Sequence, residues 1–201
     1  MNKLNRRTFI QQSGTASLKN ERFPAIIVLP QCRKDVWWQS PEMEAQALKA
    51  LEQSTKAFNG DPQRTYLTGL SMGGYGSWSI ASKYPNKFAA LAIICGGVKI
   101  PDRLRTSLNL PAPAEGTDVY AECAKKVGKT PTWIFHGDKD PAVPVEESRQ
   151  MNEALKAAGG NVKYTEYPGV NHNSWDKAYA EPELMTWLLA QKLGGNAVAQ
   201  K

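Results

Sequence analysis

Continuous apolar runs alternate along the chain with segments whose apolar positions recur at helical spacing. Residues 25–31, AIIVLPQ, form an unbroken apolar run that ends near a proline, which is typical of a strand buried on both faces. Residues 40–58 then open with Ser-Pro and place Met43 and Leu51 on one helical face. A strand followed by a helix is therefore expected before residue 60.

The same alternation continues to the C-terminus. Further strands are expected within residues 65–70, 89–97, 130–138 and 162–169. Helices are expected within residues 76–85, 145–160 and 181–195. Strands that alternate with helices predict an α/β fold, with a mostly parallel sheet and helices on both of its faces. We interpret residues 101–128, which carry three prolines, as a loop-rich excursion.

The pattern also predicts how the chain is divided. The length of 201 residues fits one domain with a sizeable core. We assign residues 23–195 to this domain, residues 1–22 to an irregular N-terminal segment, and residues 196–201 to a flexible tail. Residues 5–10, NRRTFI, resemble a twin-arginine export motif, but a polar stretch follows where an apolar one is needed. A chance basic start explains this stretch as well as a broken export signal does, so the compartment stays unknown: cytoplasmic as the sequence stands, with a hint of an exported origin.

Composition narrows the function classes. The net charge of +6 comes from scattered basic residues, so no nucleic-acid partner is expected. No apolar run is long enough to span a bilayer. The three cysteines, Cys32, Cys95 and Cys123, lie in no CxxC or CxxH motif. We therefore expect no metal site and no cofactor, and leave open whether two of the cysteines form a disulfide.

Glycines crowd a single serine at the expected junction between strand and helix near residue 70. The stretch Gly69-Leu70-Ser71-Met72-Gly73 has the G-x-S-x-G form of a nucleophile elbow. A serine needs exposure, orientation and a neighbouring base to act as a nucleophile. We expect the glycines on both sides of Ser71 to avoid collisions, and the N–H of Met72 to stabilise an oxyanion.

A base and an acid follow the later strands, where ligands of open α/β sheets bind. The chain has two histidines, and we favour His172, in a polar loop, over His136, which abuts an apolar strand. Three carboxylates lie nearby. We favour Asp140 as the partner of His172, because a Pro turn follows it, over Asp138 and Asp176. The site thus predicted consists of Ser71, His172 and Asp140.

Taken together, these stretches resemble the α/β-hydrolase superfamily. The similarity is to its serine esterase branch, near dienelactone hydrolases, phospholipase/carboxylesterases and predicted-peptidase-like esterases, and it covers residues 23–189. The resemblance implies that the acid is the last residue of an H-G-x-x-D motif, which is Asp140. It also implies a His-Gly loop that donates a second oxyanion N–H. None precedes residue 23, so the chain looks N-terminally shortened, and Gln31 or Cys32 is the candidate substitute.

The resemblance implies a cofactor-independent hydrolase that cleaves small carboxylic esters through an acyl-enzyme. Trp37, Trp38 and Trp175 are the candidates for an aromatic substrate-binding wall, although packing would explain them equally well. Two alternatives stay open. One is a serine peptidase of the same fold, and the other is a shortened hydrolase-fold protein with little activity that binds ligands or partners. An unpaired strand edge also makes a homodimer a possibility.

Overall fold

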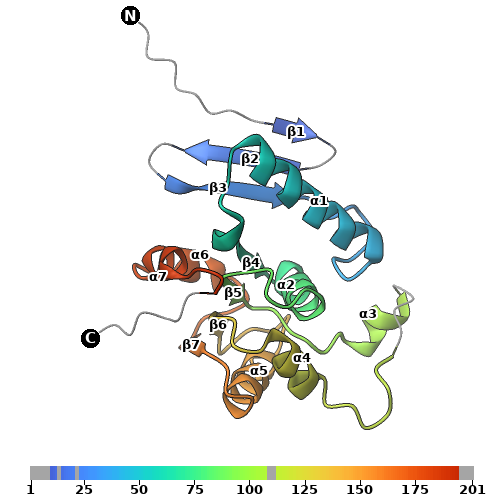
Figure 1. Cartoon of the computed structure of the whole chain (residues 1–201). Helices are drawn as coiled ribbons and strands as arrows, with labels where there is room; N and C mark the ends of the chain where they lie inside the picture. Colours follow the sequence, from blue (N-terminus) through green and yellow to red (C-terminus); the bar gives the residue numbers. More distant parts are fainter. Residues whose placement is uncertain (1–9, 13–14, 21–22, 108–111, 195–201) are drawn as a thin grey trace, which may run out of the picture. The chain divides into compact units, whose positions relative to one another are not determined.

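The computed structural model describes residues 10–12, 15–20, 23–107 and 112–194 (Figure 1). Contacts within the chain cluster into two compact units, residues 1–62 and 63–201. This grouping differs from the division into residues 1–22, 23–195 and 196–201 expected from the sequence, and that division stays a prediction. The predicted flexible tail, residues 196–201, and the twin-arginine-like stretch up to residue 9 lie outside the described residues.

The first unit contains a three-stranded antiparallel sheet in the order β1-β2-β3. Its strands are β1 (Ile10–Gln12), β2 (Thr15–Asn20) and β3 (Phe23–Pro30), and helix α1 (Pro41–Ala57) contacts β3. We expected residues 1–22 to be irregular, and this is wrong for the described residues of β1 and β2. Antiparallel pairing joins backbone groups and requires no apolar run, so the hydrophobic pattern does not reveal these strands.

Strand β3 also differs from its sequence prediction. The apolar run predicted a strand buried on both faces, yet Ile27 is 36% exposed and Leu29 is 52% exposed. Ile26 and Val28, which alternate with them, are half-buried. This alternation is the pattern of an antiparallel strand that is covered on one face only, so the prediction of two buried faces is wrong.

The second unit is built on a four-stranded parallel sheet in the order β4-β5-β6-β7. The strands are β4 (Tyr66–Leu70), β5 (Ala90–Ile94), β6 (Thr132–Gly137) and β7 (Val162–Tyr167). Every residue of β5 and β6 is buried. The predicted α/β fold with a mostly parallel sheet is confirmed.

Helices cover both faces of this sheet (Figure 1). The helices described in this unit are α2 (Met72–Lys83), α3 (Asp102–Ser107), α4 (Val119–Val127), α5 (Glu146–Ala157), α6 (Trp175–Tyr179) and α7 (Leu184–Ala190), of which α3 lies away from the sheet. On one face, Trp133 and Phe135 form a core with Leu184 and Leu188 of α7. Helices α2 and α5 contact the strands, and α4 packs against both of these helices. The strands are therefore packed between helices, and the loops that follow their carboxyl ends start from this buried sheet.

The region from residue 101 to residue 128 is more regular than the sequence indicated. It contains helices α3 and α4, whereas a loop-rich excursion was expected. The Asp118 carboxylate accepts hydrogen bonds from the backbone N–H groups of Tyr120 and Ala121, which caps α4. The three prolines made this region look loop-rich by composition, so the capped helix was not predicted.

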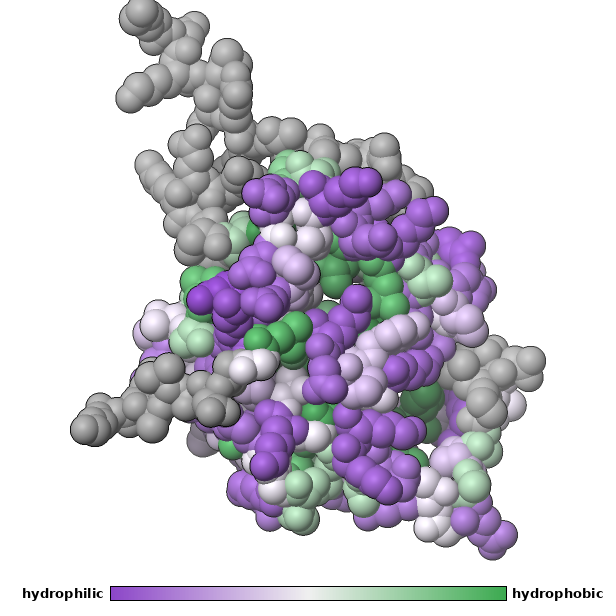
Figure 2. Space-filling view, in the orientation of Figure 1, coloured by the Kyte–Doolittle hydropathy of each residue, from purple (hydrophilic) through white to green (hydrophobic). Residues whose placement is uncertain are grey.

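The surface is predominantly hydrophilic on the face that Figure 2 shows, with apolar residues in smaller areas between. Among the described residues, no helix combines the length and the apolar character that crossing a bilayer requires. The three cysteines are free, with Cys95 and Cys123 buried. The disulfide that the sequence left open is therefore not formed.

Candidate active site

Ser71 lies between the end of β4 and the start of α2, in a strained backbone conformation. Its φ of 50° and ψ of −120° are unusual for a residue that carries a side chain. The Ser71 N–H donates to the carbonyl of Ile94, 3.0 Å away on the neighbouring strand. The Ser71 carbonyl accepts from the N–H groups of Gly74 and Tyr75 in the first turn of α2. Backbone bonds on both sides thus fix the sharp turn that holds Ser71.

The glycines around Ser71 do not all serve the same purpose. A Cβ added to Gly69 would lie 2.2 Å from the Gly73 carbonyl oxygen, and one added to Gly74 would lie 2.7 Å from the Cα of Gly96. A Cβ added to Gly73 would meet nothing within 4 Å. The expectation that glycine avoids collisions on both sides is therefore right for Gly69 and wrong for Gly73. Close packing instead requires Gly74, where α2 meets the end of β5.

A continuous hydrogen-bond chain joins Ser71, His172 and Asp140. Nε2 of His172 lies 2.9 Å from Oγ of Ser71, and its Nδ1 lies 2.7 Å from Oδ2 of Asp140. Because the carboxylate accepts only, Nδ1 carries the hydrogen and Nε2 is free to accept the Ser71 O–H. His172 is 25% exposed at its side chain, whereas the carboxylate of Asp140 is fully buried. The arrangement can move a proton from serine to histidine.

The carboxylate of Asp140 is fully occupied by donors. Oδ1 accepts from the N–H groups of Ala142 and Val143 at 2.8 and 2.9 Å, in the turn where the sequence places Pro141. Oδ2 accepts from His172 and His136. Burial by itself raises the pKa of Asp140, but the bonds from His172, Val143 and Ala142 outweigh it and hold the pKa below its ordinary value. Asp140 is therefore ionised in its buried position.

His136 supports Asp140 from the buried side. Its side chain is fully buried at the end of β6. Nε2 lies 3.1 Å from Oδ2 of Asp140 and 3.0 Å from the carbonyl of Val143, so this nitrogen carries the hydrogen. Nδ1 lies 2.6 Å from Oγ of Ser148, on α5, and accepts the hydroxyl hydrogen. Burial lowers the pKa of His136 and keeps its imidazole neutral, against the opposing effect of its Val143 and Asp140 partners.

The two other carboxylates weighed in the sequence have different partners. Asp138 accepts from the N–H of Gly169, 2.7 Å away. Asp176 lies in the first turn of α6 and accepts from the side-chain amide of Asn173 at 2.9 Å. Neither of these bonds involves His172, whereas the Asp140 carboxylate lies directly against its ring.

Two further predicted site residues lie in the same unit as Ser71. Trp175, at the start of α6, packs edge-on against His172 with ring centroids 5.5 Å apart and an interplanar angle of 88°. Trp175 also packs against the core formed by Trp133 and Phe135, so it has a structural task as well as a position beside the base. Met72 is the first residue of α2, where backbone N–H groups have no acceptor within the helix. Their roles toward a substrate stay predictions.

The remaining predicted site residues lie in the first unit, which the structure describes separately. Gln31 and Cys32 directly follow β3, and the Cys32 thiol donates to the carbonyl of Val36 at 3.4 Å. Trp37 and Trp38 lie between β3 and α1. A second oxyanion donor from Gln31 or Cys32, and an aromatic wall from Trp37 and Trp38, stay predictions.

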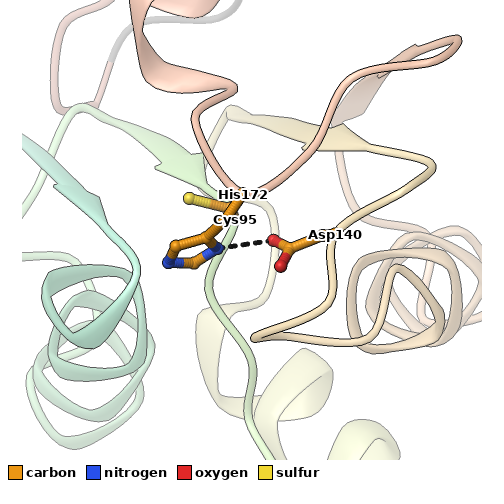
Figure 3. Close-up of side chains that lie close together, drawn as sticks. All are labelled: Cys95, Asp140 and His172. Carbon is orange, nitrogen blue, oxygen red and sulfur yellow. Dashed lines mark hydrogen bonds and ion pairs between the residues drawn. The ribbon is translucent and has the colours of Figure 1, made fainter.

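The sequence reasoning did not assign Cys95 to the site. Cys95 follows β5 directly, and its Sγ, a ring nitrogen of His172 and a carboxylate oxygen of Asp140 lie within 4.8 Å of one another. Figure 3 shows the three side chains converging from separate segments. The one available signal was position, because Cys95 stands at the carboxyl end of a strand, as Ser71 does.

The chain is similar to a hydrolase family and to several known enzymes. The model of the "Prolyl oligopeptidase family" matches residues 42–194. The chain is 28% identical over 125 residues to "Acyl-protein thioesterase 1" of Gibberella zeae, a match covering 61% of this chain and 46% of that protein. It is 28% identical over 142 residues to "Acylamino-acid-releasing enzyme" of Rattus norvegicus, covering 61% of this chain and 19% of that protein.

Among solved structures, a thermostable esterase superposes with a TM-score of 0.70 at 30% identity, covering 84% of this chain and 44% of that chain. The chain thus spans less than half the length of each of these three relatives. The parallel sheet, the serine turn after β4 and these similarities define an α/β hydrolase of the serine esterase branch. Within that superfamily, the chain belongs to the prolyl oligopeptidase family.

Proposed function

We propose that this chain is a serine hydrolase that cleaves small carboxylic esters through an acyl-enzyme. The observation that carries the proposal is the hydrogen-bond chain from Ser71 Oγ to His172 Nε2, at 2.9 Å, and from His172 Nδ1 to Asp140 Oδ2, at 2.7 Å. Both distances are short enough for proton transfer and for orientation of the ring. The similarity to a thermostable esterase supports an ester as the substrate.

The chemistry follows from this hydrogen-bond order. Ser71 Oγ attacks the ester carbonyl while its proton passes to Nε2 of His172. Asp140 stabilises the resulting imidazolium through Nδ1 and keeps the ring oriented. When the tetrahedral intermediate collapses, His172 gives the proton to the departing alcohol. Water then attacks the acyl-enzyme, with His172 acting as base, and Ser71 is regenerated.

The negative charge on the tetrahedral oxygen needs donors that are already oriented. The N-terminus of α2 directs backbone N–H groups and the positive end of the helix dipole toward this region, and Met72 supplies the nearest of them in sequence. The backbone bonds that fix Ser71 keep the turn from relaxing during the reaction. A donor that is preorganised in this way stabilises the intermediate by roughly 3–4 kcal/mol.

Cleavage of amide bonds is the second candidate. The name of the family, and the similarity to an acylamino-acid-releasing enzyme, favour it. The same three side chains would serve, but an amine leaves less readily than an alcohol and depends more on the proton from His172.

Hydrolysis of p-nitrophenyl acetate, measured beside a peptidyl p-nitroanilide, tests the proposal. We expect ester turnover with ordinary saturation, loss of nearly all of it in Ser71→Ala, and little anilide cleavage. Efficient anilide cleavage that depends on Ser71 would instead establish the peptidase. A fluorophosphonate probe should label Ser71 in the wild-type protein and not in Ser71→Ala. A folded wild-type protein with no turnover and no labelling would overturn the proposal.

A further inference from the structure

Cys95 is a buried thiol for which the proposed reaction has no use. Its φ of 39° is uncommon for a residue that carries a side chain, and the residue is fully buried. Figure 3 shows its sulfur beside the His172 ring, with the Asp140 carboxylate bonded to that ring from another side. A strained, buried thiol next to a histidine and a carboxylate combines three metal-ligand types at one place.

The spacing of the three side chains suits one small cation. Sγ of Cys95, a ring nitrogen of His172 and a carboxylate oxygen of Asp140 all lie within 4.8 Å of one another. Zn²⁺ binds sulfur at about 2.3 Å and nitrogen or oxygen at about 2.0–2.2 Å, so ligand atoms in a tetrahedral site lie roughly 3.3–3.6 Å apart. Side-chain shifts of about 1 Å would close the group around one ion.

We propose that Cys95, Asp140 and His172 form a Zn²⁺ site, and that the bound ion inactivates the enzyme by occupying its base. Metal binding is a property of these three side chains alone, whereas inactivation rests on the proposed function. The residues are shared with the active site, so the metal and the reaction compete for His172.

The charges of the ligands compensate the ion. A Cys95 thiolate and the Asp140 carboxylate carry two negative charges, which balance Zn²⁺ in a site where both side chains are buried. Sulfur and nitrogen ligands favour zinc over magnesium or calcium, which bind through oxygen. The side chain of His172 is 25% exposed, so an ion can reach the three ligands from the solvent side of this ring.

Ser174 is a second, independent feature of the same site. Its hydroxyl oxygen is buried and has no hydrogen-bond partner among the described residues. Ser174 lies two residues after His172, and its N–H donates to the His172 carbonyl at 2.8 Å. The unsatisfied Ser174 oxygen can also bind the ion or support one of its ligands.

Binding can be written with the protons balanced. Cys95 loses its thiol proton to solvent as the Zn–S bond forms, and Asp140 is already ionised. His172 keeps a single proton. Binding through Nδ1 breaks the hydrogen bond to Asp140, which frees a position on Oδ2 for the ion. The proton then lies on Nε2 and faces Ser71, so His172 cannot accept the Ser71 proton.

Calorimetric titration of the purified chain with Zn²⁺ tests the binding, and Co²⁺ absorption tests the thiolate ligand. We expect one ion per chain, with affinity lowered by at least about 10–100-fold in Cys95→Ala, as for loss of a metal-site partner. The matched control is the double variant Cys32→Ala/Cys123→Ala, which removes the other two thiols and should bind as the wild type does.

In that double variant Cys95 is the sole thiol, so a thiolate-to-cobalt charge-transfer band can come from no other sulfur. This reading stands even if Cys95→Ala does not fold. Absence of the band, or wild-type Zn²⁺ affinity in a folded Cys95→Ala, would overturn the proposal.

Ser71→Ala separates the two proposals. It should bind Zn²⁺ with unchanged stoichiometry although it turns over no ester, so binding is measured independently of the proposed function. In the wild-type protein, Zn²⁺ should abolish p-nitrophenyl acetate hydrolysis in step with binding, and EDTA should restore it. Zn²⁺ bound at one site while turnover continues would contradict the inhibitory role.

Discussion

Two regions of the second unit place a histidine on the same oxygen of Asp140, and they differ in almost every other respect. On the buried side, His136 ends β6 and is held by Ser148 of α5 and the carbonyl of Val143. On the open side, His172 lies in the loop after β7, and its other nitrogen meets Ser71. One histidine has no exposed surface, while the other is 25% exposed.

The difference shows how one carboxylate can serve both structure and reaction. Every polar atom of the His136 ring is paired within the core, so this ring cannot exchange a proton without breaking a buried bond. His172 has an equally firm bond on one side and a reactive partner on the other. Variants whose stability and turnover are measured separately therefore test whether His136 serves the structure and His172 serves the reaction.

Replacing His172 should have the largest effect on turnover and a small effect on stability. His172→Ala removes the proposed base, and loss of one member of such a triad lowers kcat by about 10⁴-fold or more. Because the ring lies partly in solvent, the melting temperature should change little. Steady-state hydrolysis of p-nitrophenyl acetate and thermal unfolding measure the two effects. Turnover within tenfold of wild type would exclude His172 as the base.

Replacing Asp140 by asparagine should be nearly as damaging to turnover. In Asp140→Asn, the N–H groups of Ala142 and Val143 hold the amide oxygen of the new side chain at the Oδ1 position. The NH₂ group then faces Nδ1 of His172 as a donor, which forces the histidine proton to Nε2. A triad with the wrong histidine tautomer loses about 10⁴-fold in kcat.

Asp138→Asn is the matched control for Asp140→Asn, because the Asp138 carboxylate bonds the N–H of Gly169 rather than the His172 ring. Kinetics of the two variants, measured side by side, check the assignment. If Asp138→Asn lowers kcat more than Asp140→Asn does, Asp140 is the wrong carboxylate.

Replacing His136 should reverse this pattern and cost mainly stability. His136→Phe removes the hydrogen-bond partner of the Ser148 hydroxyl, the Val143 carbonyl and Oδ2 of Asp140 in the core. Each such loss should lower the free energy of unfolding by about 1–3 kcal/mol. His136→Gln has both a donor and an acceptor and should retain more of the unfolding free energy. Urea unfolding of both variants measures the difference.

Turnover of His136→Gln should fall by no more than about tenfold, which corresponds to ~1.4 kcal/mol of lost orientation at Asp140. A loss of turnover in the folded His136→Gln as large as that of Asp140→Asn would show that the buried side takes part in the reaction, and that the comparison of the two regions is wrong.

The buried His136 should also make the free energy of unfolding depend on pH, an effect smaller than those of the substitutions above. Burial lowers the pKa of His136, so below the ordinary histidine pKa of about 6.5 the unfolded chain binds a proton that the folded chain does not. The free energy of unfolding should therefore fall as pH drops below about 6.5, by at most ~1.4 kcal/mol per pH unit for this group.

Asp140 has the same sign of effect in a more acidic range, because its lowered pKa stabilises the folded state above about pH 4. Urea unfolding between about pH 7 and about pH 5 lies above the range in which Asp140 titrates, and comparison of the wild type with His136→Gln isolates the His136 contribution. His136→Gln should show a flatter dependence in this range, and an unchanged slope would contradict a neutral, buried His136.

The hydrophobic pattern alone predicted most strands and several helices of the second unit. It indicated strands at β4, β5, β6 and β7 and helices at α2, α5 and α7, because buried parallel strands are continuous apolar runs and surface helices repeat every 3.6 residues. In the first unit it missed β1 and β2, whose antiparallel pairing depends on the backbone. It also overstated the burial of β3, because an apolar run does not specify which faces are covered.

The sequence by itself determined the chemistry available to this protein: a serine in a glycine-lined turn, two histidines, and carboxylates at the ends of strands. Only the tertiary structure decided which of these groups meet. His136 and His172 follow different strands of the sheet, yet both reach one oxygen of Asp140. The position of Cys95 beside His172 and Asp140 depends on the parallel register of β5 and β6. Local patterns record burial and backbone preference, whereas contacts between loops arise only when the sheet aligns the ends of its strands.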